Sequence, residues 1–454
     1  MSIMRKMLFG VAGLLLAASL APAMAQEGMP DFLTHSECEV DLSGPYAFIT
    51  QPLLAGFADA IKWYNERGGV CGASFASNEG TEYRDTGGDQ AQTQAHYDYF
   101  SSLENKPDLM VLYASGDAEL LRSQVEEDEI PAIISAGSVA GLYGEDGRTP
   151  GWIYATNPLY ADQLGSFCQF VAADPMNMYP DDPTIGYISW PGAFGQAAFT
   201  PETIAYCAEQ GVTILETPEI FLPTDTDISG QVLNLTDAGA NILYTNTLAS
   251  GPALVAKTLV DLGLEDSIGL AGVNWALDTS VGLLSSATPG SDGLPAVNGL
   301  VGSLPFLWYT ERDNPGIALI LEQFVANQRQ ASQLNISYLL GWSVVDIYTE
   351  LYIQTVNRVG SLEAVTGAEM KATIEGMDYS VLGGLLQFNF PEGLRAVPFN
   401  RIGIMYFLNA AGDGPATSGD DAATVEGPNG ATFFRPLVVP ITPFSPAPDL
   451  RPGG

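Results

Sequence analysis

The chain has 454 residues, and its 53 acidic side chains outnumber the 17 basic ones, which gives a formal net charge of −36 at pH 7. This charge repels nucleic acids and anionic membrane surfaces, and argues against both as partners. The sequence contains only two histidines, His35 and His96, which argues against a histidine-based catalytic triad or a zinc site with several histidine ligands.

The first 25 residues have the three parts of a secretory signal peptide. Arg5 and Lys6 form a basic region, residues 8–20 are apolar, and Ala23-Met24-Ala25 is a small-x-small cleavage site. The residue after the site is Gln26 and not Cys, so no lipid anchor is indicated. We therefore expect cleavage after Ala25 and an exported chain without a stable membrane anchor.

The stretch 41–72 predicts the first half of a βαβ unit. Ser43-Gly44-Pro45 is a turn signal. Apolar residues then recur at helical spacing from Leu53 to Tyr64. Residues 65–69 end the helix, because glycine accepts the left-handed conformation of a helix cap.

Strand and helix patterns alternate in the rest of the chain, which is too long for one typical core. In the first half we expect strands at 71–77, 108–113 and 131–135, and helices at 91–103 and 118–127. A second set of strands is expected at 184–189, 212–216, 241–245 and 268–271. Short connections between alternating strands and helices predict parallel, doubly wound sheets in two similar lobes.

The opening stretch and the order of the later segments resemble the periplasmic type I solute-binding proteins of the branched-chain amino acid (leucine/isoleucine/valine) ABC transporter family. In that family a Leu-Ser/Thr-Gly-Pro loop precedes a helix that ends in Asn-x-x-Gly-Gly-Val/Ile-x-Gly, and here these motifs are residues 42–45 and 65–72. The loops at 83–89 and 190–195 are also similar to those of the family. The resemblance covers roughly residues 40–410.

The resemblance implies an α/β fold of two doubly wound parallel-sheet lobes joined by three crossovers. We expect lobe one at 36–156 and 307–385, and lobe two at 157–306 and 386–442. The crossovers are expected at 152–156, 299–306 and 385–390. The Pro-rich segment 443–454 is expected to be a disordered tail.

The resemblance further implies a monomeric, periplasmic substrate-binding protein of an ABC importer, with no enzymatic activity and no cofactor. It would capture a small polar ligand (an amino acid, an amide or a small carboxylate) between two closing lobes and deliver it to the permease and ATPase subunits. A ligand-binding sensory subunit of a receptor is an alternative, because it would use the same lobes. A periplasmic hydrolase is less favoured, because we find no nucleophile–base pair.

Loops at the carboxyl ends of the predicted strands carry the candidate ligand-binding residues, since ligands of open parallel sheets bind there beside helix N-termini. Ser115 aligns with a family serine that holds the ligand carboxylate, although it could instead cap the following helix. Gly137 and Ser138 fit the family pattern in the next loop, whereas Val139 stands where a threonine is expected.

Asn274 lies where the amino-acid binders carry Glu or Asp, the partner of the ligand ammonium. An amide offers a carbonyl oxygen but no charge, and desolvating a lone ammonium costs several kcal/mol. We therefore hypothesise that the ligand lacks an α-ammonium group, or that Asp117 or Asp162 replaces the missing acid. Alternatively, Asn274 is a turn residue that points away from the cleft.

Aromatic residues in or beside these loops are expected to form the walls of the site. Each of them could also be an ordinary packing residue. The ligand-binding candidates among them are Tyr46, Tyr113, Tyr160, Phe194 and Trp275, with Phe48, Trp190 and Phe306 nearby.

Four cysteines in an exported chain suggest two disulfides, for which three pairings are possible. We favour Cys38–Cys71, on neighbouring predicted strands, and Cys168–Cys207, on consecutive predicted helices. Reduced, buried thiols are the alternative. No metal site is expected: residues 225–230 resemble the start of a calcium loop, but Thr236 stands where its glutamate ligand should be.

Overall fold

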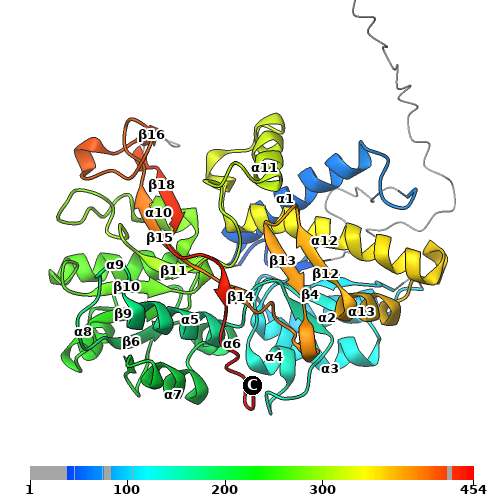
Figure 1. Ribbon diagram of the computed structural model, residues 1–454, viewed down its shortest axis with the longest axis horizontal. Coiled ribbons are helices and arrows are strands. Elements are labelled where there is room, and N and C mark those ends of the chain that lie inside the picture. The colour runs from blue at the N-terminus through cyan, green and yellow to red at the C-terminus, as the bar shows by residue number, and fades with distance from the viewer. Residues whose placement is uncertain (1–37, 45, 74, 76–82, 105, 427–431) are drawn as a thin grey trace, which may run out of the picture.

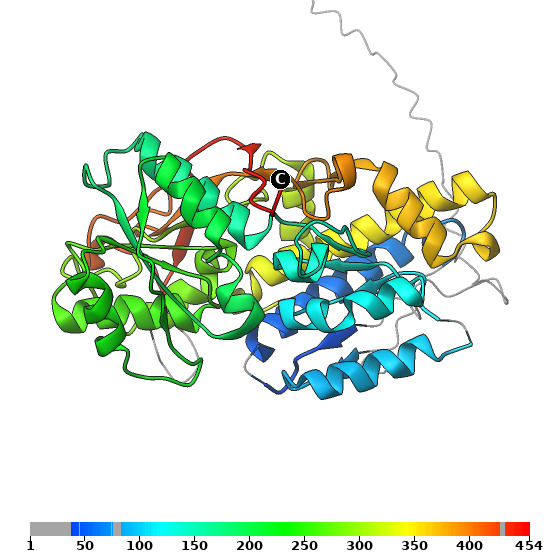
Figure 2. The same cartoon turned by 90° about the horizontal axis from the view of Figure 1, so that it is seen from below.

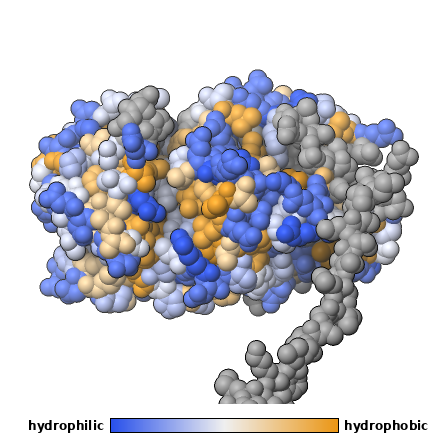
Figure 3. Space-filling view, turned by 90° about the horizontal axis from the view of Figure 1, so that it is seen from above, coloured by the Kyte–Doolittle hydropathy of each residue, from blue (hydrophilic) through white to orange (hydrophobic). Residues whose placement is uncertain are grey.

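The computed structural model describes residues 38–44, 46–73, 75, 83–104, 106–426 and 432–454. The expected signal peptide at 1–25 lies outside these residues, as do residues 74, 76 and 77 of the strand expected at 71–77. The strand prediction is wrong for residues 71–73, which form a turn closed by the bridge between Val70 and Ala73. Figure 1 shows two α/β lobes side by side. They are named here after the size of their sheets: the small lobe (blue, cyan, yellow and orange) corresponds to the expected lobe one, and the large lobe (mainly green and red) to the expected lobe two. In the view from above, a furrow runs between two halves of the surface, with apolar residues along it (Figure 3).

The small lobe contains a fully parallel five-stranded sheet in the order β2-β1-β3-β4-β5. Each of these strands is two or three residues long. In chain order they are β1 (Cys38–Val40), β2 (Tyr83–Asp85), β3 (Met110–Val111), β4 (Ala132–Ile134) and β5 (Ile153–Ala155).

Helices cover both faces of this sheet, because successive strand residues point to opposite sides. Val111, Ile133 and Tyr154 belong to the cluster that includes α1 and α12, whereas Met110 and Ile134 pack with α2, α3 and α4. The helices of this lobe are α1 (Ala47–Asn65), α2 (Gln90–Ser101), α3 (Ser115–Glu127), α4 (Val139–Tyr143), α11 (Pro315–Ala326), α12 (Ile336–Val359) and α13 (Gly367–Gly376).

Two glycines let α1 and α12 pack against each other at short range (Figure 1). A Cβ atom on Gly56 would lie 2.5 Å from the carbonyl oxygen of Tyr338, and one on Gly341 would lie 2.4 Å from that of Leu53. Since neither distance is sterically allowed, both positions require glycine. The two helices are therefore in close backbone contact.

The large lobe is built on an eight-stranded sheet in the order β18-β15-β11-β10-β9-β6-β7, with β8 also paired to β6. Its central strands are parallel, and β15 and β18 are antiparallel additions at one edge. The expected mostly parallel α/β fold is confirmed. The strands are β6 (Thr184–Ser189), β7 (Thr213–Ile214), β8 (Glu219–Ile220), β9 (Ile242–Thr245), β10 (Gly269–Gly272), β11 (Val301–Ser303), β15 (Ile402–Phe407) and β18 (Pro436–Pro440).

Polar caps and glycines set the ends of many helices. The side chains of Asp89, Thr200 and Asn335 accept hydrogen bonds from backbone N–H groups in the first turns of α2, α7 and α12. Gly263 and Gly360 end α9 and α12 with φ values of 69° and 98°. The large-lobe helices are α5 (Tyr160–Ala173), α6 (Gly192–Gln196), α7 (Pro201–Glu209), α8 (Ser229–Asp237), α9 (Ser250–Leu262) and α10 (Thr279–Ser285).

Short elements complete the described residues. The strands β16 (Thr424–Glu426) and β17 (Thr432–Phe434) form a separate two-stranded antiparallel sheet. Short 3-10 helices are η1 (Asn274–Leu277), η2 (Ala331–Gln333), η3 (Leu362–Ala364), η4 (Pro391–Gly393) and η5 (Gly419–Asp421). Within the part of the chain that the structure describes, no helix combines the length and the apolar character needed to cross a membrane.

The third crossover lies later in the chain than expected. Residues 385–390 do not cross, because β13 (Leu386–Asn389) folds back on β12 (Asp378–Val381) as an antiparallel hairpin of the small lobe. Ala396 still pairs with Ala155 at the edge of the small sheet, and β14 (Phe399–Asn400) leads directly into β15. The chain therefore crosses between residues 397 and 401.

Two buried arginines flank this crossover. Arg395 donates from Nε to the carbonyl of Gly151 at 2.5 Å and from Nη2 to Glu375 at 2.7 Å, both in the small lobe. Arg401 forms a two-pronged ion pair with Glu311, with 2.9 Å between Nη1 and Oε1. The same guanidinium donates to the carbonyls of residues 304 and 306, so it ties the second crossover to the third.

The C-terminal segment differs from the disordered tail that its composition predicted. Its strand β19 (Ser445–Pro446) pairs antiparallel with β14, and Ala447 donates to the carbonyl of Pro398 at 2.8 Å. Leu450 is buried. The only regular secondary structure of this segment is the short strand β19, but the segment is fixed by contacts with the rest of the protein.

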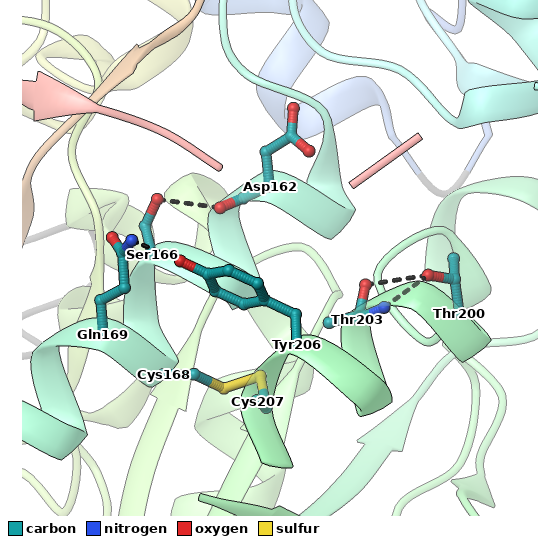
Figure 4. The surroundings of a disulfide bond; sticks show 8 residues. All are labelled: Asp162, Ser166, Cys168, Gln169, Thr200, Thr203, Tyr206 and Cys207. Atoms are coloured by element: carbon teal, nitrogen blue, oxygen red, sulfur yellow. Dashed lines mark hydrogen bonds between the residues drawn. A yellow bond between two sulfur atoms is a disulfide. The ribbon is translucent and has the colours of Figure 1, made fainter. Parts of the chain in front are cut away.

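The disulfide expected between Cys168 and Cys207 is present and joins α5 to α7 (Figure 4). The expected Cys38–Cys71 bond is absent, because Cys71 is an exposed free thiol. Cys71 lies in a turn closed by the bridge between Val70 and Ala73, whereas β1 pairs with β2 and β3. The two cysteines are thus not on neighbouring strands.

We predict that replacing both Cys168 and Cys207 by alanine lowers the free energy of unfolding by about 3–4 kcal/mol, because the bond closes a loop across a sequence separation of 39. Urea unfolding followed by circular dichroism measures this loss. Cys71→Ser is the control and should change stability by less than about 0.5 kcal/mol. Equal losses in the two variants would contradict the prediction.

The buried carboxyl of Asp117 makes the free energy of unfolding depend on pH. This buried carboxyl accepts hydrogen bonds from the Thr93 hydroxyl at 3.1 Å and from the backbone N–H of Ala114 at 3.3 Å. Burial raises its pKa from 3.8 to about 6, against the opposing effect of these bonds. Because the folded state binds the proton more tightly than the unfolded state, the stabilisation is present below about pH 4 and is lost as the pH rises through 6.

We therefore expect Asp117→Asn to reduce the loss of unfolding free energy between pH 4 and pH 7 by up to about 3 kcal/mol relative to the native chain. Urea unfolding at unit steps of pH measures this difference. Asp181→Asn removes an exposed carboxylate and should leave the pH profile unchanged. If the unfolding free energy of Asp117→Asn changed with pH in parallel with that of the native chain, the Asp117 carboxyl would not determine the pH dependence between pH 4 and pH 7.

Candidate functional site

A small cavity lies between the two lobes at the carboxyl ends of their strands. Its volume is about 30 Å³, enough for one or two water molecules, whereas ligand pockets typically span about 300–1,000 Å³. The site must therefore widen before a larger ligand enters. The small lobe contributes Tyr46, Ile49, Tyr113, Ala114, Ser115, Ser135 and Ala136, and the large lobe contributes Tyr160, Phe194, Leu248 and Trp275.

Aromatic rings from the two lobes meet around this cavity. Tyr46, in the turn that starts α1, lies 6.0 Å from Tyr113 and 6.1 Å from Trp190, measured between ring centroids. On the large-lobe side, Phe194 lies 5.3 Å from Tyr160 in an edge-on arrangement. Because Tyr46 and Trp190 belong to different lobes, their contact depends on how far the lobes are apart.

The tyrosine hydroxyls at the cavity are hydrogen-bond donors at neutral pH. Burial, followed by the nearby carboxylates Asp41 and Asp117, raises the pKa of Tyr46. Burial also raises the pKa of Tyr160, whose hydroxyl accepts a hydrogen bond of 3.1 Å from Nε1 of Trp275. These groups stay protonated and can bind an acceptor such as a carboxylate.

Ser115 lines the cavity at the start of α3. It is the first residue of α3, its exposure is 3%, and its hydroxyl forms no hydrogen bond of good geometry with any described residue, although it lies near the Tyr160 hydroxyl. It therefore does not cap the helix. A helix N-terminus and a buried hydroxyl of this kind can together bind an anion.

Gly137 and Ser138, also expected at the site, do not line the cavity. The Ser138 hydroxyl accepts from the Gly141 N–H at 3.1 Å and donates to Glu119 at 2.6 Å, which is the role of a helix cap. A Cβ atom on Gly137 would lie 2.1 Å from Cδ1 of Leu142, so packing explains this glycine.

Asn274 is fully buried and lies outside the cavity lining. Its backbone N–H donates to the side chain of Gln163 at 2.9 Å, and neither atom of its amide has a partner among the described residues. The two acids considered as substitutes are engaged elsewhere: Asp117 binds Thr93, and Asp162 accepts from the N–H of Leu450 at 2.9 Å. Among the described residues, the cavity lining contains no charged side chain.

Five lining residues were missing from the sequence-based set of ligand-binding residues: Ile49, Ala114, Ser135, Ala136 and Leu248. Ser135 directly follows β4, and Leu248 follows β9 by three residues. The rule that ligands bind at strand carboxyl ends would have found both, if it had been applied to every strand. Ile49 lies in the first turn of α1 and carries no such signal.

No group of acidic, histidine or cysteine side chains suited to a metal ion occurs within the described ranges. Asp225 and Asp227, considered above for calcium, accept hydrogen bonds from the backbone N–H groups of Leu222 and Ser229 at 2.7 and 3.0 Å. They stabilise the turn that leads into α8.

Comparison with solved structures shows the same fold in ABC transporter proteins. A branched-chain amino acid ABC transporter protein from Thermus thermophilus with bound valine matches with a TM-score of 0.65 and 18% identity, over 89% of this chain and 95% of that chain. A fatty acid ABC transporter substrate-binding protein from Thermomonospora curvata matches with a TM-score of 0.65 and 20% identity, over 81% of this chain and 87% of that chain. A solute-binding protein from R. palustris in complex with 4-hydroxybenzoate matches with a TM-score of 0.63 and 14% identity, over 88% of this chain and 95% of that chain.

At these identities the solved structures establish the fold alone. A search of curated protein sequences finds no match. The family model of the periplasmic binding proteins matches residues 40–397, most of the chain and the segments that form both sides of the cavity. The chain therefore belongs to the periplasmic binding protein family.

Proposed function

We propose that this protein is the periplasmic substrate-binding protein of an ABC importer, exported with cleavage after Ala25, and that it is not an enzyme. The observation that carries this proposal is the cavity between the lobes, because a ligand there would contact residues of both. Such a ligand stabilises the closed arrangement, and the permease, with its ATPase subunits, recognises closure. Family membership supports the same role.

The lining favours a small carboxylate with an aromatic or apolar body. Ser115, the first N–H groups of α3 and the tyrosine hydroxyls offer donors for a carboxylate, and the rings of Phe194 and Trp275 offer apolar surface. The described lining contains no acidic side chain, so the ammonium group of an α-amino acid would be desolvated there without a counter-charge in direct contact, at a cost of several kcal/mol. Of the ligands named for similar structures, 4-hydroxybenzoate fits this lining better than valine.

We expect isothermal titration calorimetry to show that 4-hydroxybenzoate and benzoate bind at least about tenfold more tightly than valine, leucine or phenylalanine, a difference of about 1.4 kcal/mol or more. The physical reason is the unpaired ammonium group of the amino acids. Tighter binding of an amino acid than of the acids without an amino group would contradict this ligand class. Failure of all these compounds to bind would also count against it.

Ser115→Ala should weaken binding of 4-hydroxybenzoate by about 1–3 kcal/mol, because one carboxylate oxygen loses its partner. Melting temperature without ligand should stay nearly constant, since the hydroxyl has no other partner among the described residues. Ser138→Ala is the matched control: it should lower the melting temperature through loss of a cap and leave affinity unchanged. The reverse pattern in the two variants would remove Ser115 from the site.

A further inference from the structure

The last twelve residues, 443–454, form a strap that lies between the two lobes, as the view from below shows (Figure 2). It begins beside the third crossover. Phe444 stacks on the guanidinium of Arg401, with 4.5 Å between Cζ and the ring centroid, and β19 pairs with β14. The start of the strap is therefore fixed at the hinge.

Further along, the strap is anchored to the large lobe on α5. A Cβ atom on Gly165 would lie 2.6 Å from Cδ1 of Leu450 and 2.7 Å from Cγ of Pro448, so the glycine makes room for these side chains. The N–H of Leu450 donates to the buried carboxylate of Asp162 at 2.9 Å. In Figure 4 this carboxylate points away from the Cys168–Cys207 bond.

The end of the strap is anchored to the small lobe. The Arg451 guanidinium stacks on the ring of Tyr143 in α4 at 4.4 Å, and is held in place by an ion pair with Asp449 at 2.6 Å. Nε of Arg148 donates to the carbonyl of Pro452 at 3.1 Å. Consecutive residues, Leu450 and Arg451, thus bind different lobes.

We propose that the strap is a fourth connection between the lobes, non-covalent at its far end, that restricts their opening. Leu450 is bound to the large lobe and Pro452 to the small lobe, and only two residues of chain separate them. This short length cannot span a widened gap between the lobes, so the cleft opens fully only when one of the two anchors breaks. Cation–π contacts and hydrogen bonds of this kind break and re-form at low cost. The inference assumes the lobe motion of the proposed function.

Asp162 is the positioning residue of this device. It shares the first turns of α5 with Tyr160, which lines the cavity, and with Gln163, which holds the backbone of Asn274. A strap bound to Asp162 therefore fixes the helix that carries one wall of the cavity. Asn at this position retains the oxygen that accepts from Leu450, whereas Ala does not.

The test measures the distance between the lobes without any ligand. Spin labels are placed at Glu127→Cys in α3 and Asp237→Cys in α8, both exposed, in a Cys38→Ser and Cys71→Ser background, and pulsed electron resonance records the distance distribution. Truncation after Ala447 should broaden this distribution and shift it to longer distances. Arg451→Ala and Asp162→Ala should shift it in the same direction, and Asp162→Asn should restore the distribution of the full chain.

Arg67→Ala is the matched control, because Arg67 stacks on Trp63 at 4.1 Å within the small lobe and makes no contact with the strap. Circular dichroism and melting curves test whether each variant is folded. If the truncated chain fails to fold, the distance distribution of Arg451→Ala alone tests the proposal. An unchanged distribution in the folded truncated chain, or in Arg451→Ala, would overturn the proposal. Addition of 4-hydroxybenzoate to the full chain tests closure separately, so a failure of the proposed ligand leaves the strap result intact.

Discussion

The arrangement of the two lobes depends on the ion pair between the buried Arg401 and the half-buried Glu311. Basic side chains are scarce in this chain, yet Arg401 is buried at the point where the second and third crossovers meet. Its two-pronged contact with Glu311 and its bonds to two carbonyls compensate for the loss of hydration. The second and third crossovers are thereby fixed to each other.

Much of the fold follows from the alternation of strand and helix patterns. The parallel centres of both sheets and the helices between them lie close to their expected positions, because each buried strand is a short apolar run between turn signals. The third crossover and residues 443–454 could not be predicted in this way. A hairpin strand looks like a crossing strand in the sequence, and a Pro-rich segment that docks on a surface has the composition of a disordered one.

The candidate site is predictable in outline but not in its individual contacts. Aromatic residues at strand ends do meet in the structure, since parallel strands bring their carboxyl ends together. Ser115 and Ser138 both stand at helix starts, and only the structure shows that the first hydroxyl is free among the described residues whereas the second caps α4. Of the two expected disulfides, Cys168–Cys207 is present and Cys38–Cys71 is absent. Pairing depends on distances between elements, which the spacing of cysteines in the sequence does not reveal.

The order of strands in the large sheet also determines when this lobe can be completed. β11 pairs with β15, and β15 with β18, so residues 301–303 wait for partners at 402–404 and for the final strand at 436–440. A chain that emerges in N-to-C order therefore carries an unfinished sheet edge until nearly all of it is available. Pairing across so long a separation is slow. The sheet of the large lobe is therefore completed only after the chain up to residue 440 is available.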